Sequence, residues 1–256
     1  MAERSSYPEG APNWVDLGTP DLDGAKRFYG SLLGWTFTGS GEATMGYTIC
    51  LLDGEPVAGL GPLHDPSVPS MWSTYLASDD ADRTAARIVE AGGRVLMEPL
   101  DVFEAGRMLY AVDPMGAGFG VWQARDHVGS RRVGEPGAPA WHELHTTTGA
   151  AADAFYGAVF GYSYEQIGDG HAFDYTLIHV GEELVGGRLR VRRDPVDVRP
   201  YWMTYFAVAD PDAAAAAVAE SGGTVLRAPV DSPYGRLAVV ADPWGAAFTV
   251  IRPTRG

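Results

Sequence analysis

The sequence predicts an α+β protein built from four β-α-β-β-β modules, paired into two tandem halves. One observation behind this prediction is an internal repeat. Short motifs recur about 127 to 130 residues later: Trp14, Phe28-Tyr29 and Gly34 as Trp141, Phe155-Tyr156 and Gly161; Trp72 and Gly92-Gly93 as Trp202 and Gly222-Gly223; Asp113-Pro114 and Gly116 as Asp242-Pro243 and Gly245. The other observation is that each half contains the order strand, helix and three strands twice.

The first module begins with a short strand at residues 13–18. Asp21 follows Thr19-Pro20 as a helix cap, and apolar residues at 3.6-residue spacing predict a helix that Gly34 ends. Strands are expected at 35–37, 47–52 and 57–60, with Asp53-Gly54 as a tight turn before the last of them.

The second module repeats this order. We expect a strand at 71–77, a helix at 79–91 that ends at Gly92-Gly93, and strands at 94–99, 106–112 and 117–122. The predicted organisation is a first domain at 12–123 (modules 13–62 and 70–122), a linker at 124–139 that is rich in Gly and Pro, and a second domain at 140–252 (modules 140–190 and 201–251) with an alanine-rich helix at 212–220.

Composition excludes several classes of function. A net charge of -14 without a basic stripe argues against nucleic acid as a partner. No apolar run approaches the ~20 residues of a membrane span, and the polar N-terminal segment does not look like a signal peptide. The lone Cys50 excludes an intramolecular disulfide. We therefore expect a cytoplasmic protein that does not act at a membrane and is a monomer or weak homodimer, because one chain already holds four modules.

Four segments carry a family resemblance: WVDLGTPDLDGAKRFYGSLLGW at 14–35, DPMGAGFGVWQ at 113–123, WHELHTTTGAAADAFYGAVFGY at 141–162 and DPWGAAFTVIRP at 242–253. With these motifs the chain resembles the vicinal oxygen chelate superfamily, which contains glyoxalase I, extradiol dioxygenases and bleomycin-resistance proteins. It is most similar to the tandem actinobacterial subgroup labelled glyoxalase-like. The resemblance covers roughly residues 12–252 and implies two tandem vicinal oxygen chelate domains, each with a cupped, mixed β-sheet. It implies this fold more strongly than any one function.

The resemblance also implies where a metal ion would bind. Metal-dependent members use His, Gln or Glu side chains on four strands of the cup. The matching positions here are Trp14, Gly59 or Gly61, Ser73 and Gly120 in the first half, and Trp141, Gly186 or Gly187, Met203 and Thr249 in the second. Indole, glycine and thioether groups are poor ligands for such ions, so we predict no metal and no other cofactor.

The segment His142-Glu143-Leu144-His145 is the main counterexample. It reads as a strand, where alternation places His142 and His145 on opposite faces. Three ligands therefore cannot converge on a metal ion from this segment alone.

We call the concave face of each predicted sheet a cup. In the family the first-strand ligand position faces inward, which implies that Trp14 and Asp16 lie in the first cup and Trp141, Glu143 and His145 in the second. Asp16 and Glu143 are candidate general bases or ligand anchors. The alternative is a structural acid, paired with Arg107 or Arg236 or capping a backbone amide.

Other candidate ligand-binding residues follow the same alternation or recur at equivalent places. They are Tyr47, Ser73, Tyr75, Tyr175, Met203 and Tyr205, which together would form a flat, polarizable surface suited to an aromatic ligand. The alternative is that these side chains are ordinary core. Arg107 and Arg236 precede the two Asp-Pro-x-Gly turns and could hold an oxyanion, or could form structural salt bridges.

Three functions remain from the sequence. The first is a metal-independent binding protein for a hydrophobic, aromatic or polycyclic natural product, similar to the bleomycin-resistance branch of the family. The alternative is a cofactor-free enzyme of secondary metabolism that uses Asp16 or Glu143 as a base. A metal-dependent lyase or dioxygenase of the glyoxalase type is disfavoured by the residues at the ligand positions.

Overall fold

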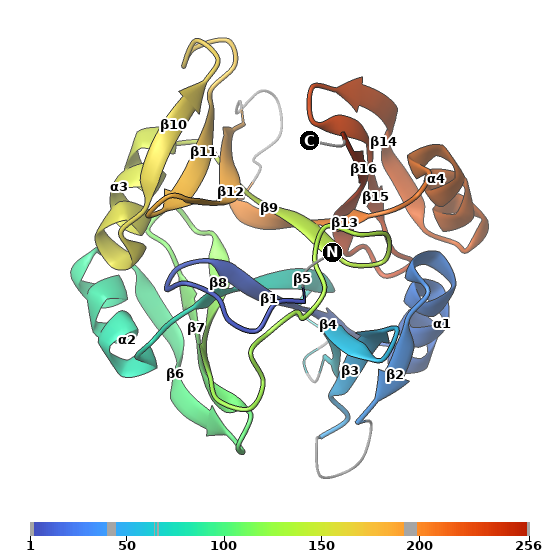
Figure 1. Cartoon of the computed structure of the whole chain (residues 1–256), viewed down its shortest axis with the longest axis horizontal. Coiled ribbons are helices and arrows are strands. Elements are labelled where there is room, and N and C mark those ends of the chain that lie inside the picture. Colours follow the sequence, from blue (N-terminus) through green and yellow to red (C-terminus); the bar gives the residue numbers. More distant parts are fainter. Residues whose placement is uncertain (1–2, 40–44, 64, 66, 192–198, 255–256) are drawn as a thin grey trace.

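The computed structural model describes residues 3–39, 45–63, 65, 67–191 and 199–254, and it contains two eight-stranded mixed sheets (Figure 1). The first domain consists of β1 (Pro12–Thr19), α1 (Leu22–Leu33), β2 (Thr36–Thr38), β3 (Thr48–Leu52), β4 (Glu55–Pro62), β5 (Met71–Ala77), α2 (Ala81–Glu90), β6 (Arg94–Val102), β7 (Gly106–Val112) and β8 (Gly118–Ala124). The second consists of β9 (Pro139–Thr146), α3 (Gly149–Phe160), β10 (Ser163–Ile167), β11 (Tyr175–Val180), β12 (Glu183–Arg190), β13 (Tyr201–Ala207), α4 (Pro211–Glu220), β14 (Thr224–Ser232), β15 (Gly235–Ala241) and β16 (Ala247–Pro253).

The strand order confirms the predicted fold class. The first sheet runs β2-β3-β4-β1-β5-β8-β7-β6 and the second β10-β11-β12-β9-β13-β16-β15-β14. Within each module the first and last strands pair in parallel, and the first strands of the two modules meet antiparallel at the centre of the sheet. Each sheet is therefore two β-α-β-β-β modules joined edge to edge.

Local chemistry explains most element boundaries. The Asp21 carboxylate accepts a hydrogen bond from the backbone N–H of Gly24 at 2.9 Å, and α1 ends at Gly34, whose φ of 75° is left-handed. Several strands are longer than the sequence predicts, among them β4 and β6. β6 continues past Pro99 to Val102, because a bulge between Met97 and Leu100 removes the need for an N–H at the proline.

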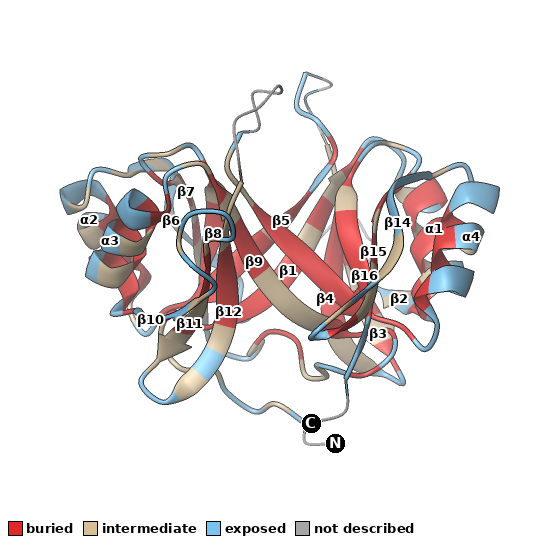
Figure 2. Ribbon diagram, turned by 90° about the horizontal axis from the view of Figure 1, so that it is seen from above, coloured by how far each residue is buried: buried red, intermediate tan, exposed pale blue. Residues whose placement is uncertain are grey.

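The two sheets pack back to back (Figure 2), with α1 beside α4 and α2 beside α3. One core cluster joins the first and fourth modules, and another joins the second and third. Strand β1 shows how the faces are divided: Val15 and Leu17 point into the shared core, whereas Trp14 belongs to a separate cluster on the opposite face. The cups therefore face away from the centre of the molecule.

The repeated motifs lie at the seam between the two domains. The Tyr29 hydroxyl donates to Asp242 Oδ2 at 3.0 Å and accepts from Trp72 Nε1 at 3.1 Å. The equivalent network has Tyr156 donating to Asp113 Oδ2 at 3.2 Å and Trp202 Nε1 donating to Tyr156 at 3.0 Å. The helix motif of each domain thus binds the Asp-Pro-x-Gly turn of the other, which explains structurally why both motifs occur twice.

None of the helices in the described part of the chain combines the length and apolar character that a membrane crossing requires.

Candidate functional site

The first cup contains a carboxylate surrounded by phenols. Asp16 Oδ2 accepts hydrogen bonds from the Tyr75 hydroxyl at 2.9 Å and the Tyr47 hydroxyl at 3.3 Å. Trp14 Nε1 donates to the Tyr47 hydroxyl at 2.9 Å. Burial raises the pKa of Asp16 to about 6, although the two phenol donors act in the opposite direction. The structure thus brings together Trp14, Asp16 and Tyr75, which the family resemblance and strand alternation place on one face, and Tyr47, a candidate because it recurs as Tyr175.

The linker places an aromatic ring against the wall of the first cup. The His127 ring lies edge-on to the Trp14 ring, with centroids 4.3 Å apart and planes at 89°. Trp122 Nε1 donates to the His127 carbonyl at 2.7 Å, and the His127 N–H donates to the Ala105 carbonyl at 3.0 Å. Burial lowers the pKa of His127 to about 4, so this ring is neutral at pH 7. In Figure 1 the chain after β8 crosses the first sheet between β7 and β3.

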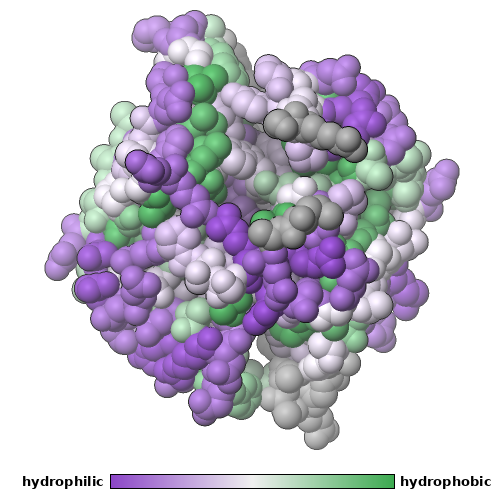
Figure 3. Space-filling model, in the orientation of Figure 1, coloured by the Kyte–Doolittle hydropathy of each residue, from purple (hydrophilic) through white to green (hydrophobic). Residues whose placement is uncertain are grey.

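The second cup contains a cavity of about 440 Å³. Figure 3 shows the hollow between the arm with β11 and β12 and the arm with β14. Aromatic and aliphatic side chains dominate its wall, with few polar groups. The lining residues are Ala140, Trp141, Glu143, Phe173, Tyr175, Leu177, Leu184, Leu189, Tyr205, Arg227, Ser232, Pro233, Tyr234, Leu237, Ile251 and Pro253.

Glu143 is the one carboxylate among these lining residues, and its side chain is only 8% exposed. Its Oε1 atom accepts a hydrogen bond from the Tyr205 hydroxyl at 2.9 Å and lies 2.6 Å from His145 Nε2. Trp141 Nε1 donates to the Tyr175 hydroxyl at 3.1 Å. Burial, and then the nearby charge of Glu143, raise the pKa of both Tyr205 and Tyr175, so both phenols stay protonated.

His145 lies beside Glu143 rather than on the cavity wall. Its ring packs on Tyr201 with centroids 4.8 Å apart, and burial raises the pKa of Tyr201 to about 12. The equivalent position in the first domain is Gly18, so the first cup has no imidazole at this position.

The residues at the family's metal positions do not fit a divalent ion. A Cβ at Gly59 would collide with the Tyr47 hydroxyl, one at Gly120 with the Tyr75 ring, and one at Gly187 with the Tyr175 hydroxyl. Phenols thus occupy the space where ligand side chains would stand, and their raised pKa disfavours the phenolate that a metal would need. Among the described residues, no group of three or more His, Cys, Asp or Glu side chains is close enough to hold an ion.

Arg107 and Arg236 do not lie in either cup, which corrects their assignment as ligand-binding residues. Arg107 forms ion pairs with Asp82 at 2.9 Å and Asp101 at 3.1 Å. Arg236 forms the equivalent pairs with Asp212 at 2.5 Å and Asp231 at 3.0 Å. Since Asp82 and Asp212 belong to α2 and α4, both guanidinium groups point to the helix side of the sheet, and the structural alternative holds.

Two further candidates, Met203 and Ser73, are not among the residues that line the cavity of the second cup. Met203 is buried in the second cup's apolar cluster, and the Ser73 hydroxyl lies 3.4 Å from the Tyr110 hydroxyl. Sequence reasoning missed several wall residues, because they come from loops and strand ends whose position depends on the fold: Phe173, Arg227, Ser232, Pro233, Tyr234 and Pro253. It also missed His127, which carries no motif.

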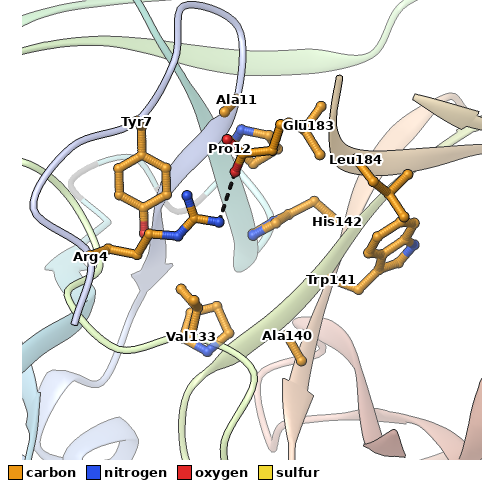
Figure 4. Close-up of a pocket in the computed structure, with 12 residues that line it drawn as sticks. Arg4, Tyr7, Ala11, Pro12, Val133, Ala140, Trp141, His142, Glu183 and Leu184 are labelled. Atoms are coloured by element: carbon orange, nitrogen blue, oxygen red, sulfur yellow. Dashed lines mark ion pairs between the residues drawn. The ribbon is translucent and has the colours of Figure 1, made fainter. Parts of the chain in front are cut away.

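His142 points to the face opposite Glu143, as the alternation predicts. There it lines a second, smaller cavity of about 150 Å³, together with the N-terminal segment and β12 (Figure 4). An ion pair of 2.8 Å between Arg4 and Glu183 lies at this cavity. Burial lowers the pKa of His142 to about 4, so no cationic imidazole stands there at pH 7.

Comparison with known proteins agrees with this architecture. Residues 11–121 match the Glyoxalase/Bleomycin resistance protein/Dioxygenase superfamily, and residues 129–251 match the glyoxalase-like domain. CFP32 of Mycobacterium tuberculosis, which carries a provisional glyoxylase name, is 41% identical over 260 residues, covering 99% of this chain and 98% of the relative. The anthracycline biosynthesis protein DnrV of Streptomyces peucetius is 38% identical over 265 residues, covering 98% and 96% of the two chains.

Solved structures show the same fold at low identity. The Mn(II)-bound glyoxalase of Novosphingobium aromaticivorans has a TM-score of 0.67 at 18% identity, covering 96% of this chain and 82% of that one. The 2,3-dioxygenase LapB of Pseudomonas sp. KL28 has a TM-score of 0.67 at 14% identity, covering 97% and 94%. By its two family domains and its full-length relatives, the chain belongs to the glyoxalase/bleomycin resistance/dioxygenase superfamily.

Proposed function

We propose that the second cup binds a flat aromatic, polycyclic molecule and that it does so without a metal ion. The observation that carries this proposal is the cavity of about 440 Å³ in the second cup, which falls in the size range of small-molecule sites. Its wall is mainly apolar, with a carboxylate and a few phenols able to fix a ligand's orientation.

The aromatic side chains of the wall favour a planar guest. Phe173 stacks on Tyr175 with planes 2° apart and centroids at 5.9 Å, and Tyr175 lies 6.4 Å from Tyr234 at 28°. Such faces gain dispersion and quadrupole energy against another flat ring. Glu143 supplies an acceptor for a ligand hydroxyl, because each carboxylate oxygen has two lone pairs.

The relatives support the same class of ligand. DnrV and DauV are named as anthracycline biosynthesis proteins, and both match this chain over nearly its whole length. A polycyclic aromatic compound of similar shape would fit the chemistry of the second cup.

Fluorescence titration with 1,8-dihydroxyanthraquinone tests the proposal. We expect saturable binding of one equivalent, with quenching of Trp141. Trp141→Phe should weaken affinity about tenfold or more, a loss of ~1.4 kcal/mol. The matched variant Trp14→Phe alters the equivalent indole of the first cup and should leave affinity within twofold.

Affinity measured after dialysis against EDTA should equal affinity in added Mn²⁺. A ligand that binds only with the metal would contradict the metal-free mode. Equal losses in Trp141→Phe and Trp14→Phe would contradict the assignment to the second cup.

A second candidate function is proton abstraction by Glu143, and the 2.6 Å contact with His145 favours it. The imidazole of His145 orients the Glu143 carboxylate. Its Nε2 atom is also placed to take the abstracted proton from Glu143 Oε1. Anthrone in D₂O is a suitable probe, because removal of a C10 proton gives the enolate, which then takes up a deuteron.

We expect the protein to accelerate this exchange about 100-fold, since general bases contribute 10² or more. Glu143→Gln should abolish the acceleration while still binding anthraquinone. Asp16→Asn is the matched control and should exchange at the normal rate. If Glu143→Gln exchanges as fast as the unmodified protein, this cavity binds but does not catalyse the exchange.

A further inference from the structure

Strand pairing makes the two cups directly comparable. Trp14 pairs with Tyr75 in the first sheet, as Trp141 pairs with Tyr205 in the second. Likewise Ala77 pairs with Trp122, as Ala207 pairs with Ile251. The wall positions around the two carboxylates therefore correspond one to one.

His127 occupies the place in the first cup where the second cup is hollow. Its ring contacts Trp14 and Trp122, with centroids 4.3 Å and 5.6 Å away. The equivalent residues Trp141 and Ile251 both line the cavity of about 440 Å³. The His127 N–H donates a hydrogen bond to the carbonyl of Ala105, which directly precedes β7. The equivalent residue in the second domain is Tyr234, which directly precedes β15 and lines the cavity.

The His127 ring behaves as a bound aromatic group rather than as part of a polar network. Its Nε2 atom is buried and has no hydrogen-bond partner in the described part of the chain. The loop around it is tied down on both sides: the Ser130 N–H donates to the Asn13 carbonyl at 2.8 Å, and Arg125 pairs with Asp101 at 2.7 Å. The ring is held by edge-to-face contacts with the indoles of Trp14 and Trp122.

We propose that the first cup is a second aromatic-binding site, which the folded chain fills with its own His127 ring, and that a guest in the second cup presents a flat ring to Trp141 at the equivalent place. The first half of this proposal stands on the geometry of the first cup. The second half rests on the proposed function. Both sites take the same class of ligand, an uncharged planar aromatic ring.

Emptying the first cup tests the first half. His127→Ala removes the ring and should lower the Tm by roughly 5 °C, because the indoles lose a packing partner. Pyrazole has the size of the missing ring and is uncharged at neutral pH. At millimolar concentration it should raise the Tm of His127→Ala and bind with one equivalent by calorimetry, as small aromatics enter engineered apolar cavities.

His127→Phe is the matched control, since it keeps a ring in the cup and should show no response to pyrazole beyond that of the unmodified protein. His127→Thr leaves a smaller hole and gives the same comparison if the alanine variant is too unstable to purify. The first half is overturned if the emptied variants respond to pyrazole no more than His127→Phe does.

The pose in the second cup is tested by NMR. Nuclear Overhauser contacts should join ring protons of bound 1,8-dihydroxyanthraquinone to the Trp141 indole and to Ile251. Contacts only to residues outside the cavity would overturn the second half.

The two experiments separate this inference from the proposed function. A pyrazole response in His127→Ala without any anthraquinone binding would retain the first cup's assignment and reject the function. Anthraquinone binding at Trp141 without a pyrazole response would do the reverse.

Discussion

The two cups began as the same structure and now differ in what fills them. In the first cup, Asp16 is enclosed by two phenols and the linker places His127 over Trp14. In the second, Glu143 is paired with His145, and a cavity of about 440 Å³ remains beside Trp141. A duplicated domain can thus keep a cavity beside the indole in one cup while a ring of the chain itself lies against the indole in the other.

Besides the linker residue His127, two strand positions differ between the cups in ways that bear on the cavity and on the carboxylate. Trp122 in the first cup is Ile251 in the second, and Gly18 is His145. The smaller aliphatic side chain leaves space, and the imidazole gives the carboxylate a partner. By contrast, the seam between the domains has the same hydrogen bonds in both copies, so the seam is conserved within the molecule where the cups are not.

The largest expected effect concerns this seam. Asp113 Oδ1 accepts hydrogen bonds from the N–H groups of Met115, Gly116 and Ala117 at 2.9, 2.7 and 2.9 Å. Asp113→Ala removes the carboxylate that these N–H groups and the Tyr156 hydroxyl share, and should lower the free energy of unfolding by about 4 kcal/mol. Asp242→Ala should cost a similar amount. Urea denaturation measures both, and a loss below ~1 kcal/mol in either would break the equivalence of the two halves of the seam.

Closing the second cup should have the next largest effect. Ile251→Trp introduces the residue of the first cup and should weaken anthraquinone binding 100-fold or more, about 2.7 kcal/mol. Trp122→Phe in the first cup is the control and should leave affinity unchanged. The Tm of each variant shows that it is folded. Normal affinity in Ile251→Trp would show that the ligand binds elsewhere.

The buried acid of the first cup should have a pH signature. The pKa of Asp16 is about 6 in the folded protein, above the value near 4 of an unfolded chain. The folded state therefore holds this proton more tightly, and the stabilisation it gives is complete below pH 4 and lost as the pH rises through 6. Asp16→Asn removes the effect.

The free energy of unfolding of Asp16→Asn minus that of the unmodified protein should therefore rise between pH 4 and 7. A shift of this size corresponds to nearly 3 kcal/mol for a fully buried group, and the partial exposure of Asp16 reduces the expectation to about 2 kcal/mol. Chemical denaturation at several pH values measures the difference. A constant difference across this range would contradict the raised pKa.

The smallest effect sharpens the symmetry of the seam. Tyr29→Phe and Tyr156→Phe each remove one hydroxyl that bridges an aspartate and an indole. Each should cost about 1 kcal/mol in thermal or urea denaturation. The two losses in free energy of unfolding should agree. A clear difference between them would show that the two halves of the seam contribute unequally to stability.

Much of the fold followed from the sequence because its signals are local. The Asp21 cap, the Gly34 helix end and the alternation of Trp14, Val15 and Asp16 depend on neighbours in the chain. For the same reason the opposite faces of His142 and His145 could be predicted. The repeat then assigned equivalent positions to both halves.

The parts that failed or were missed depend on contacts between distant residues. Alternation alone does not show that Arg107 reaches Asp82 on a helix, or that Tyr47 covers Gly59. The repeated Tyr and Asp motifs looked like features of single modules, yet Tyr29 and Asp242 are partners across the domain seam.

Periodicity and duplication in the chain determined four β-α-β-β-β modules in two halves, and the family resemblance implied a cupped sheet with an acid and an indole in each half. Only the tertiary structure decided that His127 lies against Trp14 in one cup and that Ile251 lines a cavity in the other. Whether space remains in a cup depends on the total volume of the side chains that the strands, turns and linker place there. These segments are far apart in the chain, so no single stretch of sequence shows whether a cavity remains.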